Sequence, residues 1–249
     1  MNRVNIIKAG DNYIYVVDCG GRCAFVVDPG VSEPVFEVLE QNRLQLIAIL
    51  ITHHHYDHIG GVADLKKKTH CQIVAPDPRR LDFADRVVAG FDDFYMGSVL
   101  VKVISTPGHT SSSVCYLIEP AGEQKILFTG DTLFVNGCGR IFETDPATMR
   151  KSLMNLAALD DETLVYCGHD YTVENYEFAL TVTPDDEELR ERLEQIRFAD
   201  PTVPSTIAAE KRFNPFLNCD DPDIIESLGM SGAGYDAVFA ALRRRKDNF

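Results

Sequence analysis

The segment THHHYDHIGG, residues 52–61, concentrates residues that bind metal ions. It contains four of the seven histidines of the chain, together with Asp57. Because side chains two residues apart on an extended backbone point the same way, His53 and His55 can reach one ion. Asp57 and His58 lie past the bend, where the chain changes direction, and can face a second point. The spacing predicts two metal ions side by side, in preference to a polar loop that happens to be rich in histidine.

Three further ligand-type residues each follow another apolar run and a glycine. They are His109, Asp131 and His169, which follow Gly108, Gly130 and Gly168. Glycine has no side chain and lets the backbone come close to an ion. Imidazole and carboxylate ligands without a thiolate suit zinc, iron or manganese. The prediction is two divalent metal ions per chain, with zinc preferred and iron or manganese as alternatives.

Short apolar runs place each of these ligand segments at the end of a strand. Alternating residues over 12–28 predict a hairpin, and further strands are predicted at 46–51, 71–75, 99–106, 114–118, 125–128 and 164–166. Helices are predicted after Ser32, which would be an N-cap, and at 62–68 and 146–158. Beyond residue 170 strand signals stop, and helical spacing appears at 173–182, 186–198 and 231–246. We expect an α/β metal-binding domain at 1–170 and an all-helical domain at 171–249.

Composition restricts the kind of partner and the compartment. The formal net charge of -14 argues against a nucleic-acid partner, because binding a polyanion requires a basic surface. No apolar run is long enough to span a bilayer, and the first residues contain no apolar signal region. Seven scattered cysteines, an odd number, fit reduced thiols better than a disulfide framework. We expect a cytoplasmic monomer with no membrane partner.

The four ligand segments resemble those of the metallo-β-lactamase superfamily. They read THHHYDH, PGHT, TGDT and CGHD in this chain. The resemblance implies an αββα sandwich, in which two mixed sheets pack face to face with helices outside. It implies a first metal held by His53, His55 and His109, a second held by Asp57, His58 and His169, and Asp131 bridging them.

The same resemblance assigns roles around the metals. A hydroxide between two metals, formed from a water of lowered pKa, would be the nucleophile, with Asp57 and Asp131 as catalytic ligands. Asp28, Thr52 and Thr110 either orient the imidazoles or serve as turn and cap residues. His54, at the variable position of the motif, is expected to be exposed.

Further segments resemble the hydroxyacylglutathione hydrolases, also called glyoxalase II, over nearly the whole chain. They are GDTLF at 130–134, GCGR at 137–140, CGHDYT at 167–172, PTVPST at 201–206, NPF at 214–216 and RKDNF at 245–249. The resemblance implies that the helical tail lies over the metals and holds glutathione. It implies hydrolysis of S-(2-hydroxyacyl)glutathione, such as S-D-lactoylglutathione, to glutathione and a 2-hydroxy acid such as D-lactate, in methylglyoxal detoxification.

The thiol-binding positions of this family match Arg140, Tyr171, Arg243 and Lys246. The last two are three residues apart on a predicted helix and share a face that suits a carboxylate of glutathione. Phe142, the fifth predicted substrate-binding residue, stands where better-known members have tyrosine, and Asn218 replaces an arginine. A dioxygenase for glutathione persulfide with one iron, and a hydrolase for thioesters of another thiol, are the alternatives.

Overall fold

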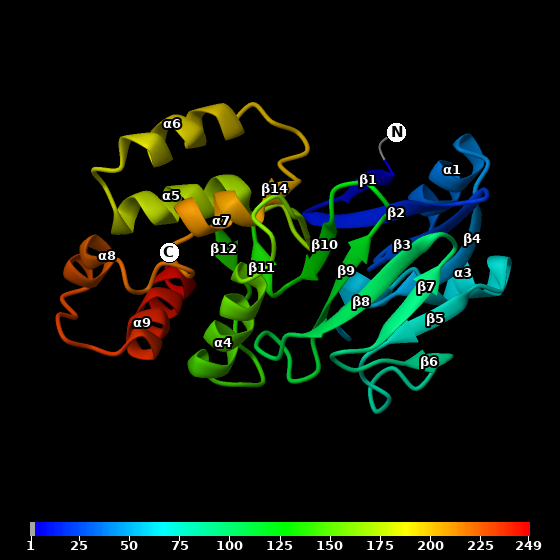
Figure 1. Ribbon diagram of the computed structural model, residues 1–249, viewed down its shortest axis with the longest axis horizontal. Helices are drawn as coiled ribbons and strands as arrows, with labels where there is room; N and C mark the ends of the chain where they lie inside the picture. The colour runs from blue at the N-terminus through cyan, green and yellow to red at the C-terminus, as the bar shows by residue number, and fades with distance from the viewer. Residues whose placement is uncertain (1–2) are drawn as a thin grey trace.

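The computed structural model describes residues 3–249 as two facing six-stranded sheets with helices on either side (Figure 1). The first sheet runs in the order β1 (Val4–Ala9), β2 (Asn12–Gly20), β3 (Cys23–Val27), β4 (Gln45–Leu50), β5 (Gln72–Ala75) and β6 (Arg86–Val87). The second runs β14 (Ser205–Thr206), β13 (Leu164–Cys167), β10 (Ile126–Gly130), β9 (Val114–Glu119), β8 (Val99–Ser105) and β7 (Asp93–Met96). Each contains parallel and antiparallel pairs, so the predicted mixed sheets are confirmed.

Both faces of the first sheet are buried. Tyr13 and Tyr15 of β2 pack between the sheets, while Ile14 and Val16 pack outward against the helices α1 (Glu33–Gln41) and α3 (Val62–Thr69). Successive side chains of a strand point to opposite faces, so a strand covered on both faces is apolar throughout. The alternating pattern expected for β2 is therefore wrong, although the predicted hairpin is present.

Helices also cover the outer face of the second sheet. Residues of α4 (Pro146–Ala157) form one cluster with Leu127, Val165 and Phe239, and the last of these belongs to α9 (Tyr235–Asp247). Figure 1 shows α4 and α9 side by side. The α4 helix begins after Asp145, whose carboxylate accepts a hydrogen bond from the Thr148 amide, as N-caps do.

The C-terminal region has no core of its own. Its helices are α5 (Thr172–Val182), α6 (Glu187–Ile196), α7 (Ile207–Phe213), α8 (Pro222–Ser227) and α9. Tyr176 of α5 and Leu193 of α6 join the core between the sheets. The region is also not entirely helical, because Ser205 and Thr206 form β14 and pair with β13. Residue 170 thus marks a change of composition across which the packing is continuous.

The predicted elements agree with the observed ones to within two residues at their ends, apart from one helix start. The α9 helix begins at Tyr235 and not at 231, because Gly232 adopts a left-handed conformation with φ of +82°. Several elements were not predicted: α7, α8, β1, β6, β7 and β14, a short helix at 56–59 and two short strands at 133–134 and 137–138. None of the helices within residues 3–249 is long and apolar enough to cross a membrane.

A buried carboxylate joins α7 to the hairpin formed by β11 (Leu133–Phe134) and β12 (Gly137–Cys138). Glu210 accepts hydrogen bonds from the Ser205 hydroxyl at 2.5 Å, the Asn136 amide at 2.8 Å and the Asn214 side chain at 3.0 Å. Burial raises the pKa of Glu210 to about 7. This hairpin follows Asp131, so the C-terminal region supports a segment next to the predicted metal site.

Candidate metal centre and adjoining cavity

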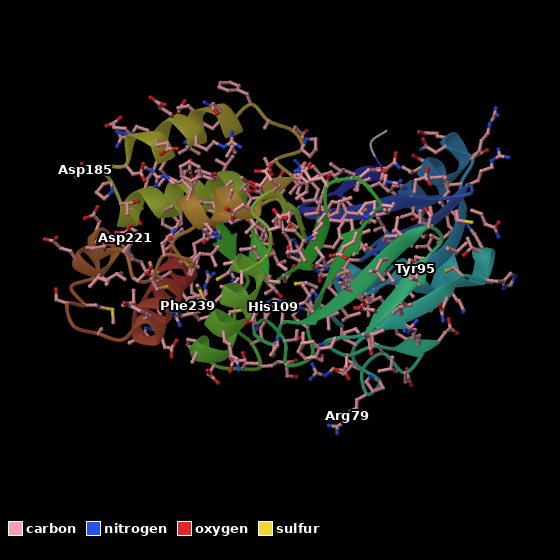
Figure 2. All side chains as sticks on the ribbon, in the orientation of Figure 1. Arg79, Tyr95, His109, Asp185, Asp221 and Phe239 are labelled. Carbon is pink, nitrogen blue, oxygen red and sulfur yellow. The ribbon has the colours of Figure 1, made fainter. Side chains whose placement is uncertain are left out.

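Four loops that follow strands meet at one edge of the sandwich and bring all seven predicted ligands together. The short helix α2 (Tyr56–Ile59) turns the loop after β4, and the other loops carry His109, Asp131 and His169. Backbone hydrogen bonds join these loops, including Gly168 N to Gly130 O at 2.9 Å and Val114 N to Thr52 O at 3.0 Å. In Figure 2, the labelled His109 lies between the sandwich and the C-terminal helices.

The glycines beside the ligands differ in what they leave room for. A Cβ at Gly168 would meet the side chains of Asp131 and His58, so the absence of a side chain is needed there. At Gly108 a Cβ would instead meet Met149 of α4. Gly168 thus leaves room for two ligands, whereas Gly130 leaves room for Thr52 and Gly108 for Met149, and the approach of backbone to an ion stays a prediction.

Three imidazoles form the first group of ligands. His55 Nδ1 lies 3.1 Å from His53 Nε2 and 2.9 Å from His109 Nε2. These are hydrogen-bond distances, yet the three atoms converge on one point from two loops, the one after β4 and the one after β8. Whether a proton or a metal ion fills that point depends on the tautomer of each ring.

The opposite nitrogens of two of these rings settle their tautomers. The Thr52 hydroxyl donates to Asp28 at 2.6 Å, because a carboxylate can only accept, and so it accepts from His53 Nδ1 at 3.0 Å. His109 Nδ1 donates to the carbonyl oxygen of Arg140 at 2.8 Å. Burial lowers the pKa of both imidazoles, which favours the neutral form. Two Nε2 lone pairs therefore face the same point, and this donor set fits a cation.

Two imidazoles and a carboxylate form the second group. His169 Nε2 lies 3.3 Å from both His58 Nε2 and the Asp57 carboxylate, and Asp57 in turn accepts from the side chain of Asn12 at 3.0 Å. Burial opposes a charged imidazole, but the carboxylates of Asp131 and Asp57 raise the pKa of His169 to about 10. A divalent cation in this position would supply the positive charge that the carboxylates otherwise draw from a proton.

Asp131 lies between the two groups. One carboxylate oxygen is 3.4 Å from His58 Nε2, and the other is 3.4 Å from His109 Nε2 and 3.3 Å from His169 Nε2. Burial opposes ionisation, yet the imidazoles hold the pKa of Asp131 well below its ordinary value. Its Oδ1 is buried and has no hydrogen-bond partner within residues 3–249. An unpartnered buried carboxylate oxygen beside imidazole nitrogens fits a bridging metal ligand.

Asp28, His53 and His58 also come close enough to hold an ion, but Asp28 is already occupied. It accepts from the Thr52 amide at 2.8 Å, from the Thr52 hydroxyl, and from His58 Nδ1 at 3.0 Å. We therefore conclude that Asp28 orients the histidines, which is one of the two roles that the sequence predicted for it. Thr52 has the same role.

Of two neighbouring residues, Thr110 has the second of its two predicted roles and only His54 differs from expectation. The Thr110 hydroxyl forms a hydrogen bond with Ser113 Oγ at 2.7 Å and none with an imidazole within residues 3–249, so Thr110 is a turn residue. His54 is not exposed as expected, since its Nε2 lies 2.9 Å from Arg80 Nη1 and its side chain is largely covered. The loop around residue 80, far from His54 in sequence, covers it.

A cavity of about 340 Å³ adjoins the ligands. It is lined by ligands from both groups, by the five predicted substrate-binding residues Arg140, Phe142, Tyr171, Arg243 and Lys246, and by the unpredicted Phe134, Cys138, Glu174 and Asn175. Tyr171 stacks parallel to His169 at 4.9 Å between ring centroids. Phe142 is 62% exposed and meets His55 and His109 edge to face.

The predicted basic pair lies in this wall, but its cations already have partners. Arg243 is buried and donates to the Cys138 carbonyl at 2.8 Å and to Asp247 at 3.1 Å. Lys246 donates to the Glu174 carboxylate at 2.7 Å. Glu174 lies one helical turn after Tyr171 on α5, and this three-residue spacing is the signal that could have identified it.

Comparison with known proteins agrees with this geometry. Residues 7–169 match the metallo-beta-lactamase superfamily, and residues 170–249 match the C-terminal region of hydroxyacylglutathione hydrolases. The hydroxyacylglutathione hydrolase of Rhodospirillum rubrum is 46% identical over 98% of this chain and 97% of its own length. That of Bradyrhizobium sp. is 43% identical over 95% and 94%.

The chain belongs to the hydroxyacylglutathione hydrolase family. The crystal structure of ETHE1 from Myxococcus xanthus has the same fold, with a TM-score of 0.66, 27% identity and 99% of each chain covered. Membership of the hydroxyacylglutathione hydrolase family and this likeness confirm the predicted family and the αββα sandwich followed by a helical region.

Proposed function

We propose that this protein hydrolyses the thioester bond of S-(2-hydroxyacyl)glutathione. S-D-lactoylglutathione is the expected substrate, and its products are glutathione and D-lactate, as in methylglyoxal detoxification. The observation that carries the proposal is the cavity in which the histidine and aspartate ligands stand beside the cations Arg140, Arg243 and Lys246. Family membership over nearly the whole chain supports hydrolysis over oxidation of glutathione persulfide.

Two divalent ions would be held at this site. The two groups of ligands, His53, His55 and His109 and then Asp57, His58 and His169, would each hold one, with Asp131 between them. Zinc is the proposed metal, and the donor set also suits iron or manganese. Two such ions, when bound, lower the pKa of a shared water toward neutrality and polarise a carbonyl oxygen.

The residues of the chain prepare the site for this reaction. Asp28 and Thr52 hold protons on the Nδ1 atoms of His58 and His53, so that the Nε2 lone pairs face the metals. Tyr171 stacks on His169 and restricts the rotation of that ring. The leaving thiol has an ordinary pKa of about 8.5–9, so it departs as a thiolate without an obligatory protein acid.

The surroundings suit a small anionic thioester more than a polymer. With a net charge of -14, the protein is unsuited to a nucleic-acid partner. The cysteines of residues 3–249 are all free, which supports a reducing compartment. We propose that the enzyme acts in the cytoplasm as a monomer.

The test is a steady-state assay of metal-replete protein on S-D-lactoylglutathione, with metal analysis of the same sample. We expect turnover and about two metal ions per chain, as two-metal hydrolysis requires. The counter-test is oxygen uptake on glutathione persulfide. One tightly bound iron, oxygen uptake and no thioester hydrolysis would refute the proposal in favour of the dioxygenase. Hydrolysis of thioesters of other thiols alone would refute the choice of glutathione.

A further inference from the structure

The carboxylate of Glu174 forms an ion pair with Lys246, the lysine that lines the cavity. We propose that Glu174 is a specificity-determining residue, which competes with a carboxylate of the thiol substrate for Lys246. This inference rests on the proposed function, because it supposes a substrate whose thiol carries carboxylates, as glutathione does. Glu174 lines the cavity but belongs to neither group of candidate metal ligands.

The contact between the two residues joins helices that are far apart in sequence. Lys246 Nζ on α9 donates to Glu174 Oε1 on α5 at 2.7 Å and to the Glu174 backbone carbonyl at 3.3 Å. An ammonium group has three N–H donors, so one remains for any ligand. A substrate carboxylate that reaches Lys246 therefore shares this cation with Glu174, or displaces it.

The exposures of the two side chains differ, and the difference indicates which one can move. The Lys246 side chain is 7% exposed, and its ammonium lies over the rings of Phe178 and Phe249 at 5.5 and 4.9 Å. The Glu174 side chain is 59% exposed. Water can solvate Glu174 in another rotamer, whereas Lys246 is enclosed by its neighbours. Glu174 is thus the movable member of the pair.

Arg243, which shares the helix face with Lys246, cannot bind a substrate carboxylate through all of its N–H groups. Its Nη1 donates to the Cys138 carbonyl and its Nε to Asp247, while its Nη2 forms no hydrogen bond within residues 3–249. A carboxylate in the cavity can therefore reach one edge of Arg243 and one N–H of Lys246. The Glu174 carboxylate beside it repels that ligand. This repulsion is absent for a thiol without a carboxylate.

The decisive variant is Glu174→Gln, which keeps the size of the side chain and removes its charge. The control is Glu177→Gln on the same helix, because Glu177 pairs with Arg197 at 2.7 Å and does not line the cavity. Isothermal titration of the metal-replete full chain would use S-methylglutathione and its diester, in which both carboxylates are blocked. Neither probe contains a thioester, so binding is measured apart from turnover.

We expect Glu174→Gln to bind S-methylglutathione about three- to tenfold more tightly than wild type, the range expected for one partly exposed charge contact. Glu177→Gln should stay within about twofold of wild type, and the diester should bind both variants and wild type alike. Lys246→Ala should remove most of the gain when combined with Glu174→Gln, because the cation for which the carboxylates compete is then absent.

Unchanged or weaker binding of S-methylglutathione by Glu174→Gln would overturn the inference, as would an equal gain on the diester. These results leave the proposed function standing if S-D-lactoylglutathione is still hydrolysed. If no variant bound S-methylglutathione and S-D-lactoylglutathione were not hydrolysed, the proposed function would fail and this inference with it. The two failures are therefore distinguishable.

Discussion

Asp28 offers the sharpest test of how this chain prepares its metal ligands. It contacts no substrate, but its carboxylate accepts hydrogen bonds from both His58 and the Thr52 hydroxyl, which in turn accepts from His53. The variant Asp28→Asn keeps the shape of the side chain. Its oxygen would stay opposite the Thr52 amide, so its NH₂ group would face His58 Nδ1. The proton of His58 would then move to Nε2, the atom that must coordinate.

The size of the effect follows from these contacts. Loss of a hydrogen bond to a charged group costs about 1.5–3 kcal/mol. A free-energy difference of that size corresponds to about a 10- to 100-fold loss of metal affinity, the range found when residues behind metal ligands are changed. Because His53 and His58 belong to different groups of ligands, the affinity for both ions should fall. Thr52→Val removes the partner of His53 alone, so it should weaken one ion.

The assay is competition for zinc between the metal-free protein and a chromophoric chelator at pH 7. Two zinc ions should be measured per wild-type chain. In Asp28→Asn the affinity for both ions should be about 10- to 100-fold lower, and in Thr52→Val only one of the two affinities should be lowered. Urea unfolding of the metal-free variants would establish that the fold is retained. If Asp28→Asn bound both ions within about twofold of wild type, our assignment of the tautomers would be wrong.

Three other predictions concern the second metal, the thiol and the C-terminal region. Asp57→Ala should lose one ion and most of its turnover with little change in fold, because Asp57 is half-exposed at the edge of the sandwich. Near-full activity with one ion bound would contradict a two-metal reaction. Changing Arg243 and Lys246 together to Ala should raise KM for S-D-lactoylglutathione about 10- to 100-fold with kcat largely kept, whereas an equal fall of kcat on a thioester without carboxylates would indicate a structural role. Burial raises the pKa of Glu210 from 4.5 to about 7, so wild type loses stability as pH rises through that window. Glu210→Gln imitates the protonated form. Its free energy of unfolding in urea, minus that of wild type, should increase by about 1–3 kcal/mol between pH 4.5 and pH 8. If this difference were constant, Glu210 would not titrate in that range.

The candidate ligands could be predicted because their chemistry is local. An imidazole or carboxylate that follows a strand end is visible in the sequence, and parallel or mixed sheets bring strand ends together. The seven ligand-type residues accordingly converge in the structure. The helices α7 and α8 were not predicted, because they span seven and six residues next to prolines and are too short to show a helical period.

Residues that act through a partner could not be predicted in the same way. Glu174 resembles any acidic residue on the solvent side of a helix until Lys246, 72 positions later, lies against it. His54 appeared exposed because nothing near it in sequence indicates that Arg80 covers it. Thr110 and Thr52 are alike in sequence, each next to a histidine, and only the structure shows that Thr52 bonds its neighbour and Thr110 does not.

The sequence by itself therefore determined which side chains can bind metal, which strands they follow and to which family the chain belongs. The tertiary structure alone decided the protonation of the ligands and the partners of the cations in the cavity. The reason is physical: ligand identity is a property of one residue, whereas a tautomer or an ion pair depends on the group opposite. For His109 that group is the carbonyl oxygen of Arg140, and for Lys246 it is the carboxylate of Glu174.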